Sequence, residues 1–260
     1  MNIRQYYSNV ANASLNGSIA ALVPVFVIII PIVFILGKKE LVFLALPFLL
    51  YSFISYQIYL IQHHRFLTSE VATTNSQIHQ YVERNEYLLT FLPAPSLRLL
   101  LFTPDGHNNV EICDKRRNKL RWFLPYFIDK LFPAEYGLYH SHKQLLISFR
   151  WRGKHAVILD QEGNTILEIA RKDEHLFLIR EKECSYHLKV DSKKLFTDIQ
   201  FYRGENRLYG RVRKGWMPLE WGKHFTDANT PVLTFHEDVS KEGRLAILAI
   251  LIKIYRYYNH

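Results

Sequence analysis

Two long apolar runs near the N-terminus constrain this chain more than any other feature. The first begins at Ile19 and ends at Leu36, and the second begins at Leu41 and ends at Ile61. A helix needs roughly 20 apolar residues to cross a bilayer, and Leu, Ile, Val and Phe each favour insertion by a few tenths of a kcal/mol. The sequence therefore predicts a two-helix transmembrane hairpin over residues 19–61, preceded by an N-terminal tail over residues 1–18.

The two runs indicate an anchor that stays on the protein. A secretory signal peptide has a shorter apolar region, a positively charged start and a small-residue cleavage site. Here Arg4 is the only charge before the first run, and a second run follows the first. Neither run contains a charged side chain, whereas the spans of transporters carry such groups. Two buried helices of a soluble protein remain the alternative.

The orientation of the anchor is inferred from charge and cysteine content. Positive residues flank the two sides of the hairpin equally: Arg4 and Arg65 on one side, Lys38 and Lys39 on the other. The positive-inside rule therefore gives a tie. Cys113 and Cys184 are too few for a disulfide framework and suit a reducing compartment, although one disulfide between them stays open. A net charge of +9 favours the anionic cytoplasmic leaflet. We expect a multi-pass protein of the cell membrane with its large domain in the cytoplasm.

The region after the hairpin has a helical pattern. Apolar residues recur at near-helical spacing: Val71, Ile78, Tyr81, Val82 and Leu88. Pro93 and Pro95 then mark a boundary, because proline and the residue before it resist helix. The sequence predicts a helical stalk or linker over residues 62–94, continuing the second span.

Short apolar or alternating segments recur about every ten residues from residue 96 onward, and Gly- or Asn-containing turns separate many of them. Strands at this spacing indicate an all-β sandwich or barrel. In residues 144–151, for example, Leu145, Ile147, Phe149 and Trp151 are expected to share one face.

The C-terminal segment, residues 244–258, favours a barrel. Its residues 245–252 are all apolar, so a helix here must be buried in protein. At about 22 Å it is too short to cross a bilayer, but a closed barrel of well over eight strands has room for it. The predicted fold class is α+β: the N-terminal transmembrane hairpin plus an antiparallel β-barrel over residues 95–260, wrapped around a hydrophobic C-terminal helix.

Residues 114–132 read as an amphipathic helix with a basic start. Five cations crowd its first turns: Lys115, Arg116, Arg117, Lys119 and Arg121. Cations oppose the helix dipole at this end, so a partner anion such as a lipid phosphate is one explanation and a solvated basic rim is the other. These five residues are the first candidate lipid-headgroup site. A second basic stretch is the next candidate: Arg203, Arg207, Arg211, Arg213 and Lys214. Its odd-numbered members are expected to share one strand face where the strand pairing is regular.

Two longer stretches resemble a known superfamily. They are GKHAVILDQEGNTILEI, residues 153–169, and PVLTFHEDVSKEGRLAILAILIKIYRYY, residues 231–258. Over about residues 95–260 the chain resembles the tubby C-terminal-like superfamily, which includes LURP-one-related proteins and phospholipid scramblases, and it looks most like membrane-anchored bacterial members. The resemblance implies a barrel of about twelve strands around a hydrophobic C-terminal helix. The phosphoinositide-binding basic residues of tubby proteins, and the calcium segment and cysteine cluster of scramblases, have no match here.

Common motifs for catalysis and metal binding do not occur in the sequence. The chain has no Gly-rich phosphate loop, G-x-S-x-G, H-E-x-x-H or paired C-x-x-C. The histidine pairs at His63-His64 and at His140 and His142 have no companion ligand at metal spacing. We therefore expect no enzyme activity, no cofactor and no metal. The basic character would also suit nucleic acid, but a membrane beside the domain accounts for it more simply.

These observations predict a membrane-tethered, non-enzymatic module that binds acidic lipid headgroups or a partner protein at the membrane. The alternative is a scramblase-like lipid translocator. Translocation needs a polar path for headgroups, and the two runs offer only Ser52, Ser55 and Gln57.

Overall fold

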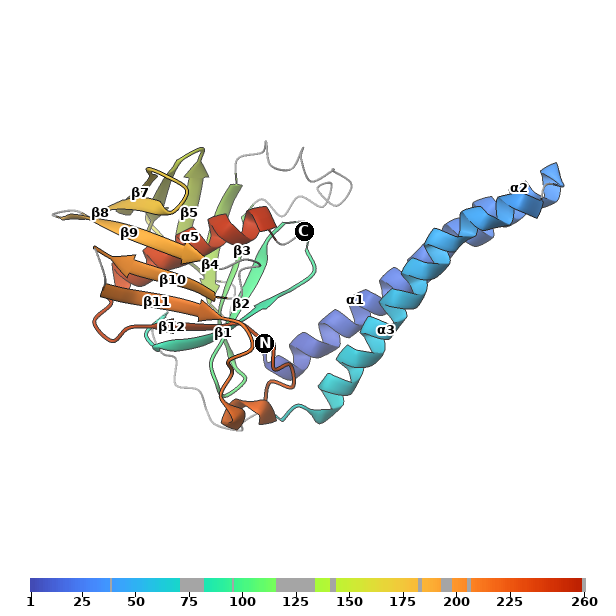
Figure 1. The fold of residues 1–260 in the computed structure, drawn as a ribbon, viewed down its shortest axis with the longest axis horizontal. Coiled ribbons are helices and arrows are strands. Elements are labelled where there is room, and N and C mark those ends of the chain that lie inside the picture. Colours follow the sequence, from blue (N-terminus) through green and yellow to red (C-terminus); the bar gives the residue numbers. More distant parts are fainter. Residues whose placement is uncertain are drawn as a thin grey trace. The chain divides into compact units, whose positions relative to one another are not determined.

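The structure, a computed structural model, describes residues 1–37, 39–70, 82–94, 96–115, 134–140, 144–181, 184–192, 198–204 and 207–258. Its contacts divide into two compact units, a helical hairpin (Asn2–Glu70) and a barrel unit (Val71–His260). The fold class is α+β, as predicted: two long apolar helices, a closed antiparallel β-barrel and a C-terminal helix (Figure 1).

The hairpin consists of two long helical arms. Its elements are α1 (Ile3–Pro24), the π-helix η1 (Val25–Ile29), α2 (Ile30–Leu36), the 3₁₀ segment η2 (Lys39–Ala45) and α3 (Leu46–Thr68). The prolines lie at the ends of regular segments in the first arm: Pro24 is the last residue of α1, and Pro31 lies in the first turn of α2, with the π-helical turn η1 between them. By length and composition, Ile3–Leu36 and Val42–Thr68 could each cross a membrane.

The predicted N-terminal tail is wrong, since helix α1 begins at Ile3. A capping box starts the helix: the Asn2 side chain accepts the Gln5 backbone N–H at 2.8 Å, and the Gln5 side chain accepts the Asn2 backbone N–H at 3.1 Å. Hydropathy alone missed this start because the first turns of α1 are polar. The first arm is 34 residues long, or about 51 Å, against a hydrocarbon core of roughly 30 Å.

Hydrogen bonds and a cation–π contact join the two arms. The buried hydroxyls of Ser18 and Ser52 lie 3.0 Å apart. Near the start of α1, the Arg4 guanidinium donates to the Phe66 carbonyl at 3.2 Å and lies 4.8 Å from the Phe66 ring. Along α3, aromatic rings at helical spacing form a ladder of contacts: Tyr56, Tyr59, His63 and Phe66. Helix α3 therefore continues the second apolar run into the first residues of the predicted stalk and ends at Thr68.

Twelve strands form the barrel, each antiparallel to its neighbours, and β12 pairs with β1 to close it. The strands are β1 (Glu86–Phe91), β2 (Arg98–Phe102), β3 (Asn108–Asp114), β4 (Ala134–His140), β5 (Leu145–Arg152), β6 (His155–Leu159), β7 (Thr165–Arg171), β8 (Leu176–Arg180), β9 (Ser185–Ser192), β10 (Asp198–Arg203), β11 (Arg207–Arg213) and β12 (Val232–Phe235). A short 3₁₀ segment, η5 (Leu219–Lys223), lies in the β11–β12 loop.

The predicted helical stalk over residues 62–94 is wrong in its later part, because residues Glu86–Phe91 form strand β1. Tyr87 and Leu89 belong to the barrel core, and Leu88 between them pairs with Phe102 on β2. A strand that is apolar on both faces gives no alternation, so its leucines fitted a helical spacing by coincidence. Val82, with a φ of 57°, starts the turn into β1. Of the other stalk positions used for that prediction, Val71, Ile78 and Tyr81 lie outside the described residues.

Strand β5 follows its predicted alternation with one shift. Ile147, Phe149 and Trp151 are buried in the core, as expected. The register slips between Leu138 and Tyr139 on β4, which leaves Leu146 as the extra residue on β5. This β-bulge places Leu146 in the core in place of Leu145.

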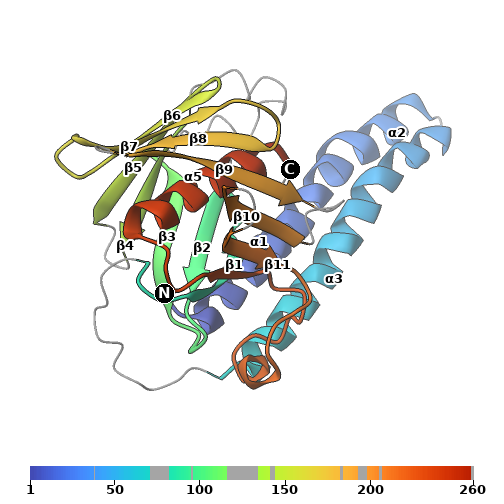
Figure 2. The ribbon, with the colours of Figure 1, turned by 60° about the vertical axis from the view of Figure 1, so that its left-hand side comes forward.

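Helix α5 (Lys241–Tyr258) fills the barrel (Figure 2). Its residues from Ala246 to Ile252 are fully buried, and they form one core cluster with the inward side chains of the strands. Gly210 on β11 lies close to the helix: a Cβ there would lie 3.0 Å from Ile247 Cδ1 and 3.3 Å from the Thr234 carbonyl. The predicted buried helix is confirmed.

Buried polar groups fasten α5 at both ends. At its start, the Arg244 guanidinium donates to the carbonyls of three successive residues before β1: Val82 at 3.0 Å, Glu83 at 2.7 Å and Arg84 at 2.7 Å. Along its length, Trp151 Nε1 donates to the Ala249 carbonyl at 3.1 Å, and near its end Lys253 Nζ donates to the Gly153 carbonyl at 2.6 Å. Each of these side chains can stay buried because it has an acceptor.

Burial makes Lys253 sensitive to pH. Burial first, and then the nearby positive charges of Arg171 and Arg256, lowers the pKa of Lys253 to about 8. The ammonium also lies 4.6 Å from the Trp151 ring, which favours the charged form and limits the effect.

We expect the barrel to become more stable as the pH rises from about 7.5 to about 9.5, by on the order of 1 kcal/mol. Between these values the unfolded chain still holds the Lys253 proton that the folded chain releases, so stability increases with pH. Urea unfolding of the detergent-solubilised chain, followed by tryptophan fluorescence, measures this. Lys253→Met should abolish the difference between the two pH values, and an equal pH dependence in parent and variant would contradict the assignment.

Candidate functional site

A groove on the wall of the barrel is the candidate site. It has a volume of about 710 Å³ and runs over β11, β12 and the start of β1. Its charged and titratable lining residues are Arg84, Glu86, Arg211, Arg213, His236 and Glu237. The lining carries three arginines, whose guanidinium groups are suited to an anionic ligand.

Strand geometry brings two of the arginines together. Arg211 and Arg213 are two residues apart on β11, so both point outward while Val212 between them lies in the core. The sequence analysis predicted that odd-numbered members of this basic stretch share a face, and this is confirmed for the pair. Arg84 comes from the turn before β1. This turn reaches the groove because β12 lies between β1 and β11 and pairs with both.

Carboxylates orient two of the three groove arginines. Arg211 makes a two-pronged contact with Asp198 on β10, with Nε and Nη2 at 2.7 and 2.6 Å from its carboxylate oxygens. The hydrogen bond to Asp198 raises the pKa of Arg211. Arg84 Nη1 donates to Asp105 at 3.0 Å. These partners fix the guanidinium groups and neutralise part of their charge.

Arg213 differs from the other two. Its guanidinium lies 5.1 Å from the ring centroid of Trp216, a cation–π contact. Among the residues that the structure describes, no carboxylate forms an ion pair with it. Arg213 is therefore the groove cation best able to meet an external anion.

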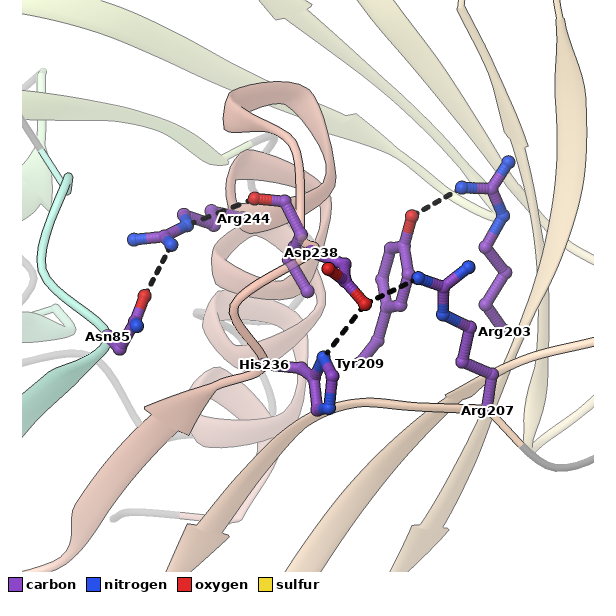
Figure 3. Close-up of polar contacts among 8 residues, drawn as sticks. Asn85, Arg203, Arg207, Tyr209, His236, Asp238 and Arg244 are labelled. Carbon is purple, nitrogen blue, oxygen red and sulfur yellow. Dashed lines mark hydrogen bonds and ion pairs between the residues drawn. The ribbon is translucent and has the colours of Figure 1, made fainter.

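A second polar cluster lies beside the groove (Figure 3). Asp238 accepts from Arg207 Nη2 at 2.7 Å and lies 3.4 Å from His236 Nδ1. On β10, Arg203 contacts the Tyr209 hydroxyl and lies 4.2 Å from the Tyr186 ring. Burial raises the pKa of Tyr186, so its phenol stays neutral. Because Arg203 and Arg207 are held by these partners, the predicted second basic stretch does not act as one continuous cationic face.

The first candidate cluster falls mostly outside the described residues. Only Lys115 of the five is described, whereas Arg116, Arg117, Lys119 and Arg121 are not. Lys115 Nζ donates to Glu135 at 3.0 Å, and Arg150 donates to the same oxygen at 3.3 Å. Glu135 keeps a lowered pKa: its burial raises the value, but the two cations lower it by more. The charge of Lys115 is thus compensated within the barrel.

Metal-ligating and thiol groups do not form a site among the described residues. No group of three or more His, Cys, Asp or Glu side chains among them could hold a metal ion. Cys113 on β3 is buried and Cys184 is exposed, and no disulfide joins these two described residues. The disulfide that the sequence left open is therefore not formed.

Sequence reasoning did not single out Arg84, His236 or Trp216. Arg84 lay inside the predicted stalk, and His236 follows a strand with no motif around it. Trp216 follows Lys214-Gly215, and this turn signal was read only as a strand end. The adjacent aromatic residue could have been noticed as a loop feature.

Comparisons with known proteins do not place the chain in a family. No protein-family model and no curated protein matches it. An X-ray structure of a protein from Arabidopsis thaliana matches at 12% identity, over 66% of this chain and 91% of that chain, with a TM-score of 0.39. A likeness this weak carries no functional argument, so membership of the tubby-like superfamily stays a prediction from the sequence.

Proposed function

We propose that this chain is a membrane-tethered, non-enzymatic module whose tubby-like barrel binds acidic lipid headgroups in the cytoplasm, at the cell membrane. The observation that carries the proposal is a groove that presents three arginine charges, on a chain that also has two helices able to span a bilayer. A phosphate or carboxylate headgroup matches this charge, and Arg213 supplies a cation without an ion-pair partner among the described residues.

The side chains of the hairpin support the proposal that it anchors the chain in a membrane. Its outward side chains between the aromatic ladder and η2 are large and apolar, as a lipid-facing surface requires. Tyr56 and Tyr59 end this region on α3, and tyrosines commonly lie at membrane–water interfaces. The polar first turns of α1 and the last turns of α3 would then extend beyond the bilayer.

The alternative, a scramblase-like translocator, has less support. Headgroups crossing the bilayer need polar groups along the helices. Ser18 and Ser52 instead lie against each other at 3.0 Å and are buried between α1 and α3. A hydroxyl pair of this kind serves helix packing in a membrane and favours the anchor.

We expect Arg84→Gln with Arg213→Gln to weaken binding of dihexanoyl phosphatidylserine by about 10- to 30-fold, because each cation near an anionic group contributes about 1 kcal/mol. Binding is measured by thermophoresis on the full chain in phosphatidylcholine nanodiscs. Lys189→Gln, which makes the same charge change on an exposed position of β9, should change affinity by less than about twofold.

The five-residue Gln variant of Lys115, Arg116, Arg117, Lys119 and Arg121 separates the two candidate sites. Weaker binding in this variant alone would move the site from the groove to that cluster. Unchanged binding in both variants would contradict headgroup recognition and leave a partner protein as the ligand of the barrel.

We also expect the barrel to face the cytoplasm. Cys184 is exposed and Cys113 is buried, so Cys184 is the residue that reports topology. A membrane-impermeant maleimide should label Cys184 only after cells are permeabilised, and Cys184→Ser should remove that signal. Labelling of Cys184 in intact cells would place the barrel outside and contradict the cytoplasmic assignment.

A further inference from the structure

The β11–β12 loop exposes two large apolar side chains. Trp216 is 68% exposed and Leu219 is 97% exposed. In the described part of the barrel unit, these are the large hydrophobic side chains that stand in solvent, whereas the remaining ones are buried or half-buried. An exposed apolar pair on an otherwise well-covered domain indicates a contact surface.

The loop is built to present these side chains. The 3₁₀ segment η5 begins at Leu219, with the Trp221 N–H donating to the Pro218 carbonyl at 3.1 Å. Phe225 follows, is buried, and packs edge-on against Phe102 at 5.9 Å between ring centroids. The base of the loop is therefore fastened to the barrel, while its tip remains apolar and uncovered.

Cations surround the tip. Arg213 lies against the Trp216 ring at 5.1 Å, and Lys214 and Lys223 are exposed on either side of the two apolar residues. Glu220 is the one acidic residue from 213 to 223. Apolar side chains bordered by Lys and Arg are the composition of segments that lie in the interface of anionic membranes.

We propose that Trp216 and Leu219 insert into the interfacial region of an anionic bilayer, with Lys214, Lys223 and Arg213 at the level of the headgroups. This inference rests on the proposed function and adds a second lipid contact to it, continuous with the groove through Arg213. Tryptophan favours the membrane interface because its ring is apolar and its N–H is polar. The covalent link to the hairpin makes the contact intramolecular, so a weak affinity is sufficient.

A lipid surface fits this tip better than a protein does. A stable protein interface buries about 800 Å² on each partner. Two side chains supply at most a few hundred Å², and the residues around them are charged. A bilayer needs only these anchors, because its surface adapts to a small protruding loop.

The experiment uses the full chain with Cys184→Ser and Leu219→Cys, labelled with the fluorophore NBD. Cys113 stays in place because it is buried. The protein is reconstituted into phosphatidylcholine vesicles with or without phosphatidylserine, and doxyl-labelled lipids report contact with the bilayer. The control carries Glu162→Cys, an exposed position in the β6–β7 turn.

We expect blue-shifted emission and doxyl quenching at position 219 in phosphatidylserine vesicles, and neither effect at position 162. Lys214→Gln with Lys223→Gln should lower the ratio of inserted to free loop by about 25-fold, about fivefold for each cation. Equal quenching at the two positions, or no loss on removing the lysines, would overturn the inference.

The outcome is distinguishable from failure of the proposed function. Soluble headgroup binding depends on the groove and is measured without loop insertion. Loss of the signal at 219 with intact phosphatidylserine binding would reject the loop and keep the groove. Quenching at 219 with no soluble binding would reject the groove and keep the loop.

Discussion

The structure depends on the burial of helix α5 inside the barrel. A closed barrel of twelve strands encloses more space than strand side chains alone can fill, and the residues from Ala246 to Ile252 fill it with fully buried apolar groups. Arg244 ties the start of the helix to the turn that leads into β1, and Trp151 and Lys253 tie its later turns to the wall and to the β5–β6 turn. The wall around this helix carries Arg84, Arg211 and Arg213 in one groove.

Much of the fold could be predicted because single segments carry unambiguous patterns. Eight successive apolar residues in a helix too short to span a bilayer require burial on all sides, and regularly spaced turns indicate many short strands. The predictions failed where a local pattern has two explanations. The apolar residues around Leu88 fit helical spacing but belong to β1, and the polar first turns of α1 concealed the helix that the capping box at Asn2 begins.

The candidate site was less predictable, because it is assembled across the sheet. Sequence spacing identified Arg211 and Arg213 as neighbours on one strand face, but Arg84 joins them through the β1–β12 pairing, far away in sequence. The sequence also does not reveal which carboxylates pair with the cations. Asp198, Glu135 and Asp238 neutralise part of the charge of Arg211, Lys115 and Arg207, and these pairs follow from strand order and loop geometry. Arg213 has no ion-pair partner among the described residues, and it contacts the exposed Trp216 in the β11–β12 loop.

The most direct test of this account compares the same substitution at a buried and an exposed leucine. Leu248 is fully buried on α5 and Leu219 is 97% exposed. Urea unfolding of the full chain in detergent should show that Leu248→Ala lowers the free energy of unfolding by about 2–5 kcal/mol, whereas Leu219→Ala changes it by no more than about 0.5 kcal/mol. Equal, small effects of the two substitutions would contradict a barrel held together by its central helix.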